Sequence, residues 1–575
     1  MKKIMSLLLA AMMLIGLFAG CGGETASQPE AVSEPASVSE ASAAAAEETP
    51  EAPAAEEEPA PAEEISVEAA AEPVTISYPL EGDDLTLSMW VSVFIGSPYS
   101  DHPVFVAAEE ATGVKIEFLE TNPGAERENF QLTVASGDYP DVFRGLNNFY
   151  TGGASAAISD EVIYDLAPYM EEFAPDYWSL LNGEAYAASI KDVYDDEGRM
   201  GCMFQLSSNP NYTSQSIMFR ADWLEELGME IPTTIEENYE YMKATKETFG
   251  ATNACYMNDE FQYTELANAY GVAGYTLSAV GSSGSHFFQV DGVAKSSFNE
   301  TGFQSYLKTL NQWYSEGIIN KDFISNQSGT MTEYLYAAGN DCGRYNQVQV
   351  GQVSTLYETA ATNGIDGYEL VPGVPMVENE GDVQHFKQTS VFGANLAVTT
   401  ACEDVELAVK WLNYFSTEDG ILLCNYGVEG SSWERDAEGN PVYTDFYTNN
   451  PDYPISQVEE ALCMPQMCTV KIVDRMDYVY DELAQQALDT WTNNEFADSA
   501  YVLPSGMTFN TEEQEVITAT LSDIETYAAE CLPKFIMGEM DAEADWDEFV
   551  SNVESMGLQD VLDAYQSCLD RYYAR

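Results

Sequence analysis

Short stretches of alternating hydrophobic and polar residues begin the folded part of the chain, and helical patterns separate them. Residues 85–91 and 114–118 alternate in this way, and 141–143 end in a short apolar pair, so each stretch predicts a strand. Residues 103–112 and 126–135 have helical patterns, and a glycine follows each shortly. The order strand, helix, strand, helix, strand predicts a parallel α/β sheet.

Amphipathic helical patterns continue to the C-terminus. Thr234 is expected to cap a helix that Pro232 introduces, with Glu237 completing a capping box, and Thr511 with Gln514 predicts a second box. Four tryptophans fall on apolar helical stripes and are expected in the core: Trp223, Trp313, Trp411 and Trp546. Further helices are expected over 303–313, 404–415, 546–556 and 558–573.

The N-terminus has the pattern of a secretory signal. Two lysines precede an apolar run over 4–18, which is short for a membrane span, and Ala19-Gly20 stand directly before Cys21. This ending resembles a bacterial lipobox, with Phe18 where the motif usually has Leu, and it implies that residues 1–20 are removed and Cys21 is lipidated. The alternative is an ordinary secreted protein in which Cys21 is incidental.

The residues after Cys21 differ in composition from the rest of the chain. Residues 24–73 are rich in Ala, Glu, Pro and Ser and contain no Lys, Arg or aromatic residue. Such a stretch cannot bury enough apolar surface to offset the entropy of ordering it. We therefore expect a disordered tether over 21–78, followed by a folded region over 79–575.

Charge narrows the choice of partners. The formal net charge is −74, from 96 Asp and Glu against 22 Lys and Arg. A chain with so few cations has no basic surface for nucleic acid and no electrostatic attraction to anionic lipid. The acidity is expected to serve solubility at an outer surface.

Cysteine and histidine patterns point to neither a metal centre nor catalysis. The nine cysteines after Cys21 are scattered, with no C-x-x-C pair, and we expect most of them to be buried thiols. The three histidines belong to no zinc or triad motif, and no nucleophile elbow or P-loop occurs. We predict no enzyme activity, no metal and no cofactor.

Several segments in order resemble one family. They are Thr112-Gly113-Val114-Lys115-Ile116, Val134-Ala135-Ser136-Gly137-Asp138-Tyr139-Pro140-Asp141, Phe219-Arg220-Ala221-Asp222-Trp223-Leu224, Ile231-Pro232-Thr233-Thr234, Tyr314-Ser315-Glu316-Gly317-Ile318-Ile319, Asn425-Tyr426-Gly427-Val428-Glu429-Gly430 and Asp570-Arg571-Tyr572. With them the chain resembles extracellular solute-binding proteins of ABC importers, the group that includes maltose-binding protein, and most closely the long lipoprotein branch of Firmicutes. The resemblance implies a two-lobed α/β fold of the periplasmic-binding-protein type II, with a hinge and a ligand cleft between the lobes.

The resemblance also implies the extent of each lobe. Lobe 1 would comprise about 83–212 and 375–426, and lobe 2 about 213–374 and 428–575. Some relatives carry an Asp- and Asn-rich calcium loop after the helix that Pro-Thr-Thr begins. Residues 249–255 here lack the alternating oxygen ligands that such a loop needs, so we predict no calcium at this position.

Candidate ligand-binding residues are aromatic or planar polar side chains at predicted strand ends and crossovers, where open α/β sheets bind ligands. Aromatic rings suit the apolar faces of sugars, and Arg or Asn can satisfy their hydroxyl groups. The candidates are Trp90, Arg144, Asn209, Tyr212, Arg344, Tyr345, Glu429 and Trp433. The alternative is core packing for the aromatic residues and neutralisation of a nearby carboxylate for the arginines.

Together these features predict a monomeric lipid-anchored protein at the extracellular face of the cell membrane. It would bind a small solute, an oligosaccharide first of all, and deliver it to the transmembrane subunits of an ABC permease. Two alternatives stay open. One is a surface adhesin or sensor partner without a transport role, and the other is a peptide or cationic solute in place of a sugar.

Overall fold

The computed structural model describes residues 74–575 apart from a set of short gaps. These gaps are 93–97, 123, 210, 253, 255–256, 258–263, 275–285, 326–340, 388–390, 453–454, 477–480 and 494. The predicted signal peptide, Cys21 and the tether up to residue 73 also lie outside the described residues. No helix in the described part of the chain is long and apolar enough to cross a membrane.

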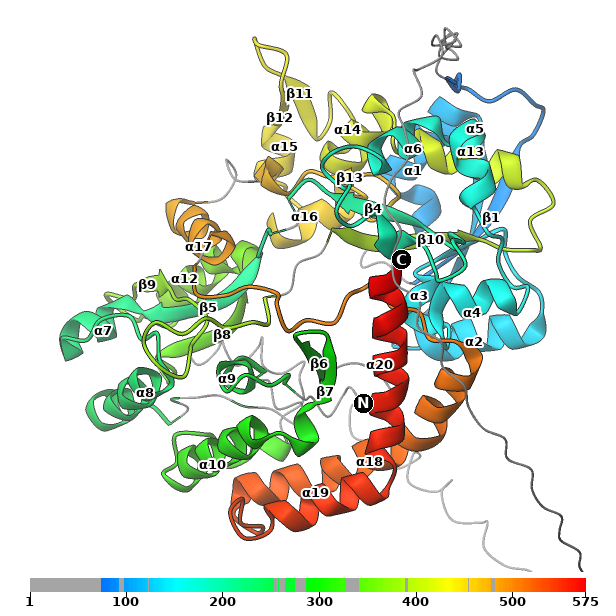
Figure 1. Cartoon of the computed structure of the whole chain (residues 1–575). Helices are drawn as coiled ribbons and strands as arrows, with labels where there is room; N and C mark the ends of the chain where they lie inside the picture. Colours follow the sequence, from blue (N-terminus) through cyan, green and yellow to red (C-terminus); the bar gives the residue numbers. More distant parts are fainter. Residues whose placement is uncertain are drawn as a thin grey trace, which may run out of the picture. The chain divides into compact units, whose positions relative to one another are not determined.

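A six-stranded mixed sheet organises the first part of the chain (Figure 1). Its order is β13-β4-β10-β3-β1-β2, formed by Val470–Lys471, Met203–Ser207, Phe392–Val398, Val142–Arg144, Thr86–Val91 and Lys115–Glu120. The strand β1 pairs in parallel with both β2 and β3, which confirms the predicted parallel βαβαβ unit. The strand β10 is antiparallel to β3 and β4, so it runs against the predicted unit.

Helices bury the apolar faces of this sheet. They are α1 (Pro103–Thr112), α2 (Glu126–Ser136), α3 (Leu146–Phe149), α4 (Gly153–Ser159), α5 (Met170–Phe173), α6 (Pro175–Leu181), α13 (Val405–Tyr414) and α14 (Glu418–Tyr426). One hydrophobic core contains Val104, Phe105 and Trp411. A second, smaller core contains Trp90, Phe130 and Phe143.

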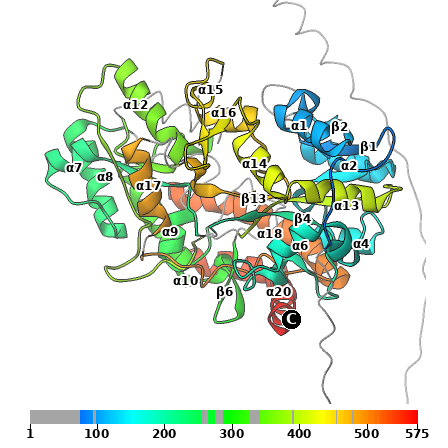
Figure 2. The ribbon, with the colours of Figure 1, turned by 90° about the horizontal axis from the view of Figure 1, so that it is seen from above.

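The second sheet has three strands in the order β8-β5-β9, with both pairs antiparallel. The strands are Arg344–Gln349, Gln215–Arg220 and Leu370–Pro372. Figure 2 shows the surrounding helices α7 (Ala221–Leu227), α8 (Ile235–Phe249), α9 (Thr264–Ala269), α12 (Val353–Thr362) and α17 (Glu482–Thr492). The helix α17 contacts β5 and β9 directly and shares a core with Tyr345.

A further group of helices, three of them at the C-terminus, extends the core of the second sheet. It comprises α10 (Thr301–Ser315), α18 (Thr511–Met537), α19 (Trp546–Ser555) and α20 (Leu558–Ala574), together with the hairpin of β6 (Phe287–Val290) and β7 (Val293–Ser296). Figure 1 shows α18 beside α20, and one hydrophobic cluster joins all four helices to α8. The other α-helices and strands of the described residues are β11 (Trp433–Arg435), β12 (Pro441–Tyr443), α15 (Asp445–Thr448) and α16 (Ile455–Leu462).

The chain crosses between the two sheets more than once. It passes from β4 to β5 through 208–214 and returns from β9 to β10 through 373–391. The strand β13, at 470–471, pairs with β4 although it lies inside the range predicted for lobe 2. The range predicted for lobe 2 therefore includes a strand of the first sheet.

Local predictions from the sequence are confirmed with one exception. Thr234 and Glu237 form the predicted capping box. The box expected from Thr511 and Gln514 is wrong by one residue, because Asn510 accepts from the backbone N–H of Glu513 and the Glu513 carboxylate accepts in return. The four tryptophans expected in the core are all buried, as are all eight described cysteines, and these eight form no disulfide.

Candidate functional site

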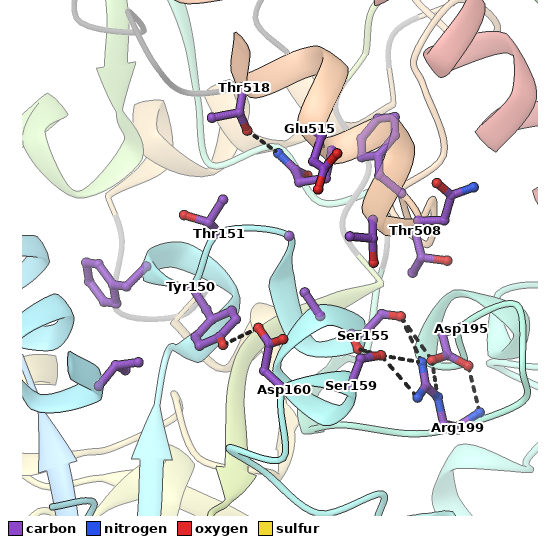
Figure 3. A pocket seen from close by; sticks show the side chains of 18 of the residues that line it. Tyr150, Thr151, Ser155, Ser159, Asp160, Asp195, Arg199, Thr508, Glu515 and Thr518 are labelled. Carbon is purple, nitrogen blue, oxygen red and sulfur yellow. Dashed lines mark hydrogen bonds and ion pairs between the residues drawn. The ribbon is translucent and has the colours of Figure 1, made fainter. Parts of the chain in front are cut away.

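A groove lies at the carboxyl end of β3. One wall is the segment 147–160, which contains α4, and the other is the segment 505–525, which contains the first half of α18. Two adjoining cavities of about 920 Å³ and 720 Å³ share Tyr150 and Ser155 on the first wall and Gln514 on the second. We call the two cavities together the α4–α18 groove, and Figure 3 shows the larger one.

The position of the groove follows from the sheet. Parallel strands direct the following turns to one edge, and open α/β sheets bind ligands at that edge. Gly145 follows β3 with a φ of 82°, a conformation that a residue with a Cβ rarely adopts, and its N–H donates to the Asn395 carbonyl at 2.7 Å. This turn leads the chain from the sheet into α3 and α4, which carry the first wall.

Aromatic side chains line both walls. Phe149 and Tyr150 come from the end of α3, and Phe509 lies on the opposite wall. Phe149 is supported from behind by Trp90, whose ring lies 5.4 Å away, edge to face, and by Phe130 at 5.6 Å. The predicted residue Trp90 therefore contacts an aromatic side chain that lines the groove.

Polar groups on the first wall are held in place by hydrogen bonds (Figure 3). The Tyr150 hydroxyl donates to Asp160 Oδ2 at 2.7 Å. Burial, together with this carboxylate, raises the pKa of Tyr150, so the phenol stays protonated. Asp195 accepts from Ser155 Oγ at 3.1 Å and from Arg199 Nε at 2.7 Å. The wall thus presents hydroxyl and carboxylate oxygens.

The second wall presents hydroxyl and amide groups. On α18, Gln514 Nε2 donates to Thr518 Oγ1 at 3.2 Å, and Thr511 and Thr508 line the same cavity. The capping residue Asn510 also faces this cavity. Uncharged donors and acceptors of this kind can bind the hydroxyl groups of a sugar.

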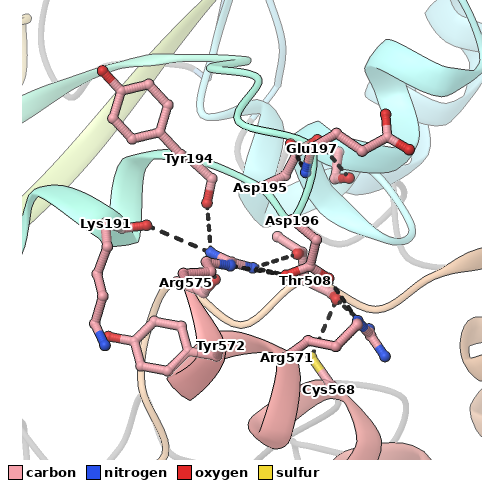
Figure 4. A network of polar contacts seen from close by, with 12 residues as sticks. Lys191, Tyr194, Asp195, Asp196, Glu197, Thr508, Cys568, Arg571, Tyr572 and Arg575 are labelled. Atoms are coloured by element: carbon pink, nitrogen blue, oxygen red, sulfur yellow. Dashed lines mark hydrogen bonds and ion pairs between the residues drawn. The ribbon is translucent and has the colours of Figure 1, made fainter. Parts of the chain in front are cut away.

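The C-terminal helix links the second wall to the 195–199 segment, which is bonded to the first wall through Ser155 and Asp195 (Figure 4). Arg571 donates to Asp196 Oδ2 at 2.7 Å and to Glu513 Oε2 at 2.7 Å, so it joins the 195–199 segment to the start of α18. Arg575 Nη1 donates to the Tyr194 carbonyl at 2.6 Å and to the Gly506 carbonyl at 2.8 Å. These contacts set the spacing of the walls at one end of the groove.

Four of the predicted ligand-binding residues are buried in cores and do not line the groove. Trp90 is 1 % exposed, and its Nε1 donates to Asn129 at 2.8 Å. Arg344 pairs with Glu265 at 2.8 Å, and Tyr345 packs in the core of the second sheet. Trp433 is buried, and its Nε1 donates to the Gly427 carbonyl at 2.9 Å. These positions match the core-packing and charge-neutralisation alternatives.

The other four predicted residues are partly or fully accessible, but they do not lie together. Arg144 Nη1 donates to the Tyr99 hydroxyl at 3.1 Å. Asn209 lies in the first crossover, and Tyr212 lines a separate cavity of about 460 Å³. Glu429 is exposed, 3.5 Å from Arg435 Nε. The structure therefore brings none of the eight predicted side chains into the lining of the α4–α18 groove.

The first wall has a signal in the sequence that the prediction did not use. Phe149 and Tyr150 follow the predicted strand at 141–143 by only a few residues, so the strand-end rule that selected Arg144 also reaches them. The second wall comes from α18, more than 350 residues later in the chain. Its amphipathic pattern indicates a helix and does not indicate which segment the helix faces.

Metal-binding groups do not gather in the described residues, where no three of His, Cys, Asp and Glu lie close enough to hold an ion. In the loop at 249–255, Thr252 is held by Asp341, whose oxygens accept from its N–H at 2.8 Å and its hydroxyl at 2.5 Å. The prediction that this loop binds no calcium stays a prediction.

Comparisons with known proteins agree with this architecture. Over 500 residues the chain is 21 % identical to lipoprotein LipO of Bacillus subtilis, covering 82 % of this chain and 90 % of LipO. It is also 21 % identical to the fructooligosaccharide ABC transporter substrate-binding protein FusA of Streptococcus pneumoniae, covering 81 % and 86 % of the two chains. A structure of FusA in complex with kestose superposes with a TM-score of 0.65 at 16 % identity, covering 85 % of this chain and 99 % of FusA.

The solved structure of the alginate-binding protein AlgQ2 without calcium has a TM-score of 0.68 at 21 % identity, and covers 86 % of this chain and 100 % of AlgQ2. These structural similarities confirm the predicted type II two-lobed fold. The family model for bacterial extracellular solute-binding proteins matches residues 98–421, more than half of the chain. The protein belongs to the bacterial extracellular solute-binding protein family.

Proposed function

We propose that this protein is the lipid-anchored solute-binding component of an ABC importer, and that it binds an oligosaccharide in the α4–α18 groove and delivers it to the permease. The observation that carries the proposal is the lining of the groove. Aromatic rings, hydroxyl groups and amides face each other across it, at the sheet edge where α/β proteins bind ligands. The protein acts as a monomer and needs no cofactor.

Affinity would come from two kinds of contact. Phe149, Tyr150 and Phe509 offer apolar faces to sugar rings, while Gln514 and the threonines beside it offer hydrogen bonds. The proposed lobes are 83–212 with 375–426, to which 464–471 is added, and 213–374 with the rest of the C-terminal region. A solute that contacts both lobes better when they are closed would shift the hinge toward the closed form.

The comparisons support a sugar as the solute. FusA is named for fructooligosaccharides and has been solved with kestose, and AlgQ2 is named for alginate. At 16–21 % identity these proteins share the fold of this chain, and they do not identify its solute. The choice among sugars has to come from the groove itself.

The anchor rests on Cys21 and on the name of the relative LipO. The tether over 21–78 would let the folded region move relative to the membrane. Replacing Cys21 with Ser in the full-length protein should move it from the membrane fraction to the medium, and mass spectrometry of the wild type should find a lipid on Cys21. An unmodified Cys21 in membrane-bound protein would refute this part of the proposal.

Binding to a panel of solutes tests the proposed function. Kestose, maltotriose, xylotetraose and lacto-N-tetraose would be titrated by calorimetry, with spermidine and a tripeptide mixture for the alternative solutes. At 100 times its Kd a ligand stabilises the folded protein by about 2.7 kcal/mol, which a thermal shift detects. Binding of spermidine or peptides without any oligosaccharide would refute the sugar and retain the fold.

Two variants locate the site. Phe149→Ala removes a ring from the groove and should weaken oligosaccharide binding at least tenfold, whereas Phe446→Ala removes an exposed ring elsewhere and should leave the Kd unchanged. Equal affinities for the two variants would show that the solute binds outside the α4–α18 groove.

A further inference from the structure

We infer that the α4–α18 groove selects uncharged oligosaccharides and rejects those that carry carboxylate groups, such as uronates and sialylated sugars. This inference rests on the proposed function and adds the charge of the solute to it. It depends on where the few cations of the chain lie, and on what each of the two that line the groove already binds.

Every Lys and Arg of the folded region has a described position. After Lys2 and Lys3 the chain contains 20 Lys and Arg, which is the total of 22 less the two near the N-terminus. All 20 lie among the residues that the structure describes, because the gaps between 74 and 575 contain no Lys, Arg or His. Residues outside the described part of the folded region therefore cannot supply a cation to the groove.

Of these cations, Arg127 and Arg199 line the α4–α18 groove. Arg199 Nε lies 2.7 Å from Asp195 Oδ2 and 3.2 Å from Glu197 Oε2, so two carboxylates neutralise its guanidinium. Arg127 Nη2 donates to the Asn148 carbonyl at 3.2 Å, and its guanidinium carbon lies 6.0 Å from the centre of the Phe149 ring. Arg199 is therefore already paired with carboxylates, whereas Arg127 is exposed and lines only the smaller of the two cavities.

Carboxylates outnumber cations along the larger cavity. Asp160, Asp195, Asp196, Glu197 and Glu515 line it, against Arg199 alone. Asp195 and Asp196 pair with arginines, while Asp160 accepts from Tyr150 and Glu515 is exposed on α18. A sugar carboxylate entering the larger cavity would lose water, meet like charges and find the one arginine of that lining, Arg199, already paired with Asp195 and Glu197.

A neutral sugar can form favourable hydrogen bonds with the same carboxylates. Its hydroxyl groups can donate to Asp160 and Glu515, and such bonds to ionised acceptors are stronger than bonds between neutral groups. Gln514 and the threonines can donate to its oxygens in exchange. The same carboxylates that repel an acidic sugar therefore contribute to binding an uncharged one.

Matched pairs of sugars test the inference on the intact mature protein. The pairs are xylotetraose with its 4-O-methylglucuronic acid derivative, lacto-N-tetraose with its sialylated form, and galactotriose with trigalacturonate. In each pair that binds, the neutral member should bind at least tenfold more tightly at 0.02 M salt. The difference in affinity within each pair should become smaller at 0.5 M salt, where charges are screened.

Charge variants show whether the groove causes the preference. Glu515→Lys should raise the affinity for the acidic member at least fivefold, and Asp160→Asn, which retains an acceptor for Tyr150, should raise it less. Glu358→Lys changes an exposed carboxylate on α12, outside the lining of the groove, and should leave the ratio within each pair unchanged.

The outcomes separate the two proposals. Equal or tighter binding of an acidic member overturns the selection for neutral sugars and leaves oligosaccharide binding intact. Binding of neither member in any pair, with binding of spermidine or peptides, overturns the proposed function and this inference with it. A shift with Glu358→Lys equal to that with Glu515→Lys would show that net charge, and not the groove, sets the preference.

Discussion

Arg571 connects the C-terminal helix to the second wall of the groove and to the segment 195–199, and its removal should loosen that end of the molecule. Its guanidinium bonds to Asp196 Oδ2 at 2.7 Å, to Glu513 Oε2 at 2.7 Å and to the Thr508 carbonyl at 3.0 Å. Arg571→Met preserves much of the side-chain volume and removes all of these bonds. The carboxylate of Glu513, a buried residue, then keeps its N-cap bond and loses its counterion.

The size of the effect follows from burial. Breaking a fully buried ion pair costs about 3–5 kcal/mol, and an exposed pair is worth about 0–1 kcal/mol. The Arg571 side chain is 30 % exposed and that of Glu513 is 9 % exposed, so the pair lies between these limits. We expect a loss of about 2 kcal/mol in the local free energy of opening, which corresponds to a roughly 30-fold change in the opening equilibrium.

Hydrogen exchange measures this local opening. The amides in the last two turns of α20 and in 192–197 should exchange roughly 30-fold faster in Arg571→Met, while those of β1 should be unchanged. Asp570→Asn, at an exposed position next to Arg571, is the matched control. Adding Glu513→Gln to Arg571→Met should restore part of the protection, because the unpaired buried charge is removed.

The stability that the ion pairs of Arg571 contribute should fall as the pH is lowered. Burial alone would raise the pKa of Glu513 and that of Asp196, but hydrogen bonds from Arg571, joined at Asp196 by Arg575, leave both pKa values lowered. A lowered pKa in the folded state contributes stability above the unfolded pKa of about 4, and this stability is lost as the pH falls through the folded value. The difference between wild type and Arg571→Met should therefore shrink between about pH 5 and pH 3.

Two results would refute this account. One is a change in exchange of less than twofold in α20. The other is a double variant with no more protection than Arg571→Met, which would mean that the Glu513 charge is not the source of the cost.

Other residues give shorter tests. Arg344→Met breaks the pair with Glu265, whose side chain is 20 % exposed, and should cost about 2–4 kcal/mol in urea unfolding, with the Kd of the folded protein unchanged. A weakened Kd at normal stability would instead support Arg344 as a ligand contact. Trp90→Ala should lower the free energy of unfolding by about 3–5 kcal/mol, because the ring is buried against Phe130, Phe143 and Phe149. A variant that unfolds at the wild-type urea midpoint would contradict this packing. Tyr150→Phe removes the hydroxyl bonded to Asp160 and should weaken oligosaccharide binding by about threefold to tenfold in calorimetry, as expected for one hydrogen bond. The eight buried thiols should react with a thiol reagent only after unfolding, and modification of several in the native protein would contradict their burial.

Local structure was predictable because its causes are local. The segment 85–143 carries its own alternation, glycine stops and strand spacing, and the parallel pairing of β1 with β2 and β3 follows from them. The capping box at Thr234 needs only four consecutive residues. The failed box at Thr511 shows the limit, because Asn510 is an equally good cap and one residue of displacement satisfies the same pattern.

Long-range pairing was not predictable from local patterns. The strand β10 lies between β3 and β4 although about 250 residues separate it from β3 in the sequence, and β13 extends the same sheet from still later in the chain. Arg344 was a candidate because it is a planar polar side chain at a predicted strand end or crossover. Its place is decided by Glu265 and Asn238, which lie 79 and 106 residues away in the sequence.

Trp90 shows how a strand-end rule can point to the edge of a sheet where a groove lies and still select a side chain that does not line the groove. The rule concerns the edge of the sheet, and β1 does end at the edge from which the groove opens. A side chain within the strand, however, packs against the covering helices, and Trp90 meets Phe130 and Phe149 there. The residues that reach the groove are those in the turn after β3, where Gly145 leads the backbone off the sheet. Under the proposed function, the residues just beyond the end of β3 are therefore better ligand candidates than Trp90, which lies within β1.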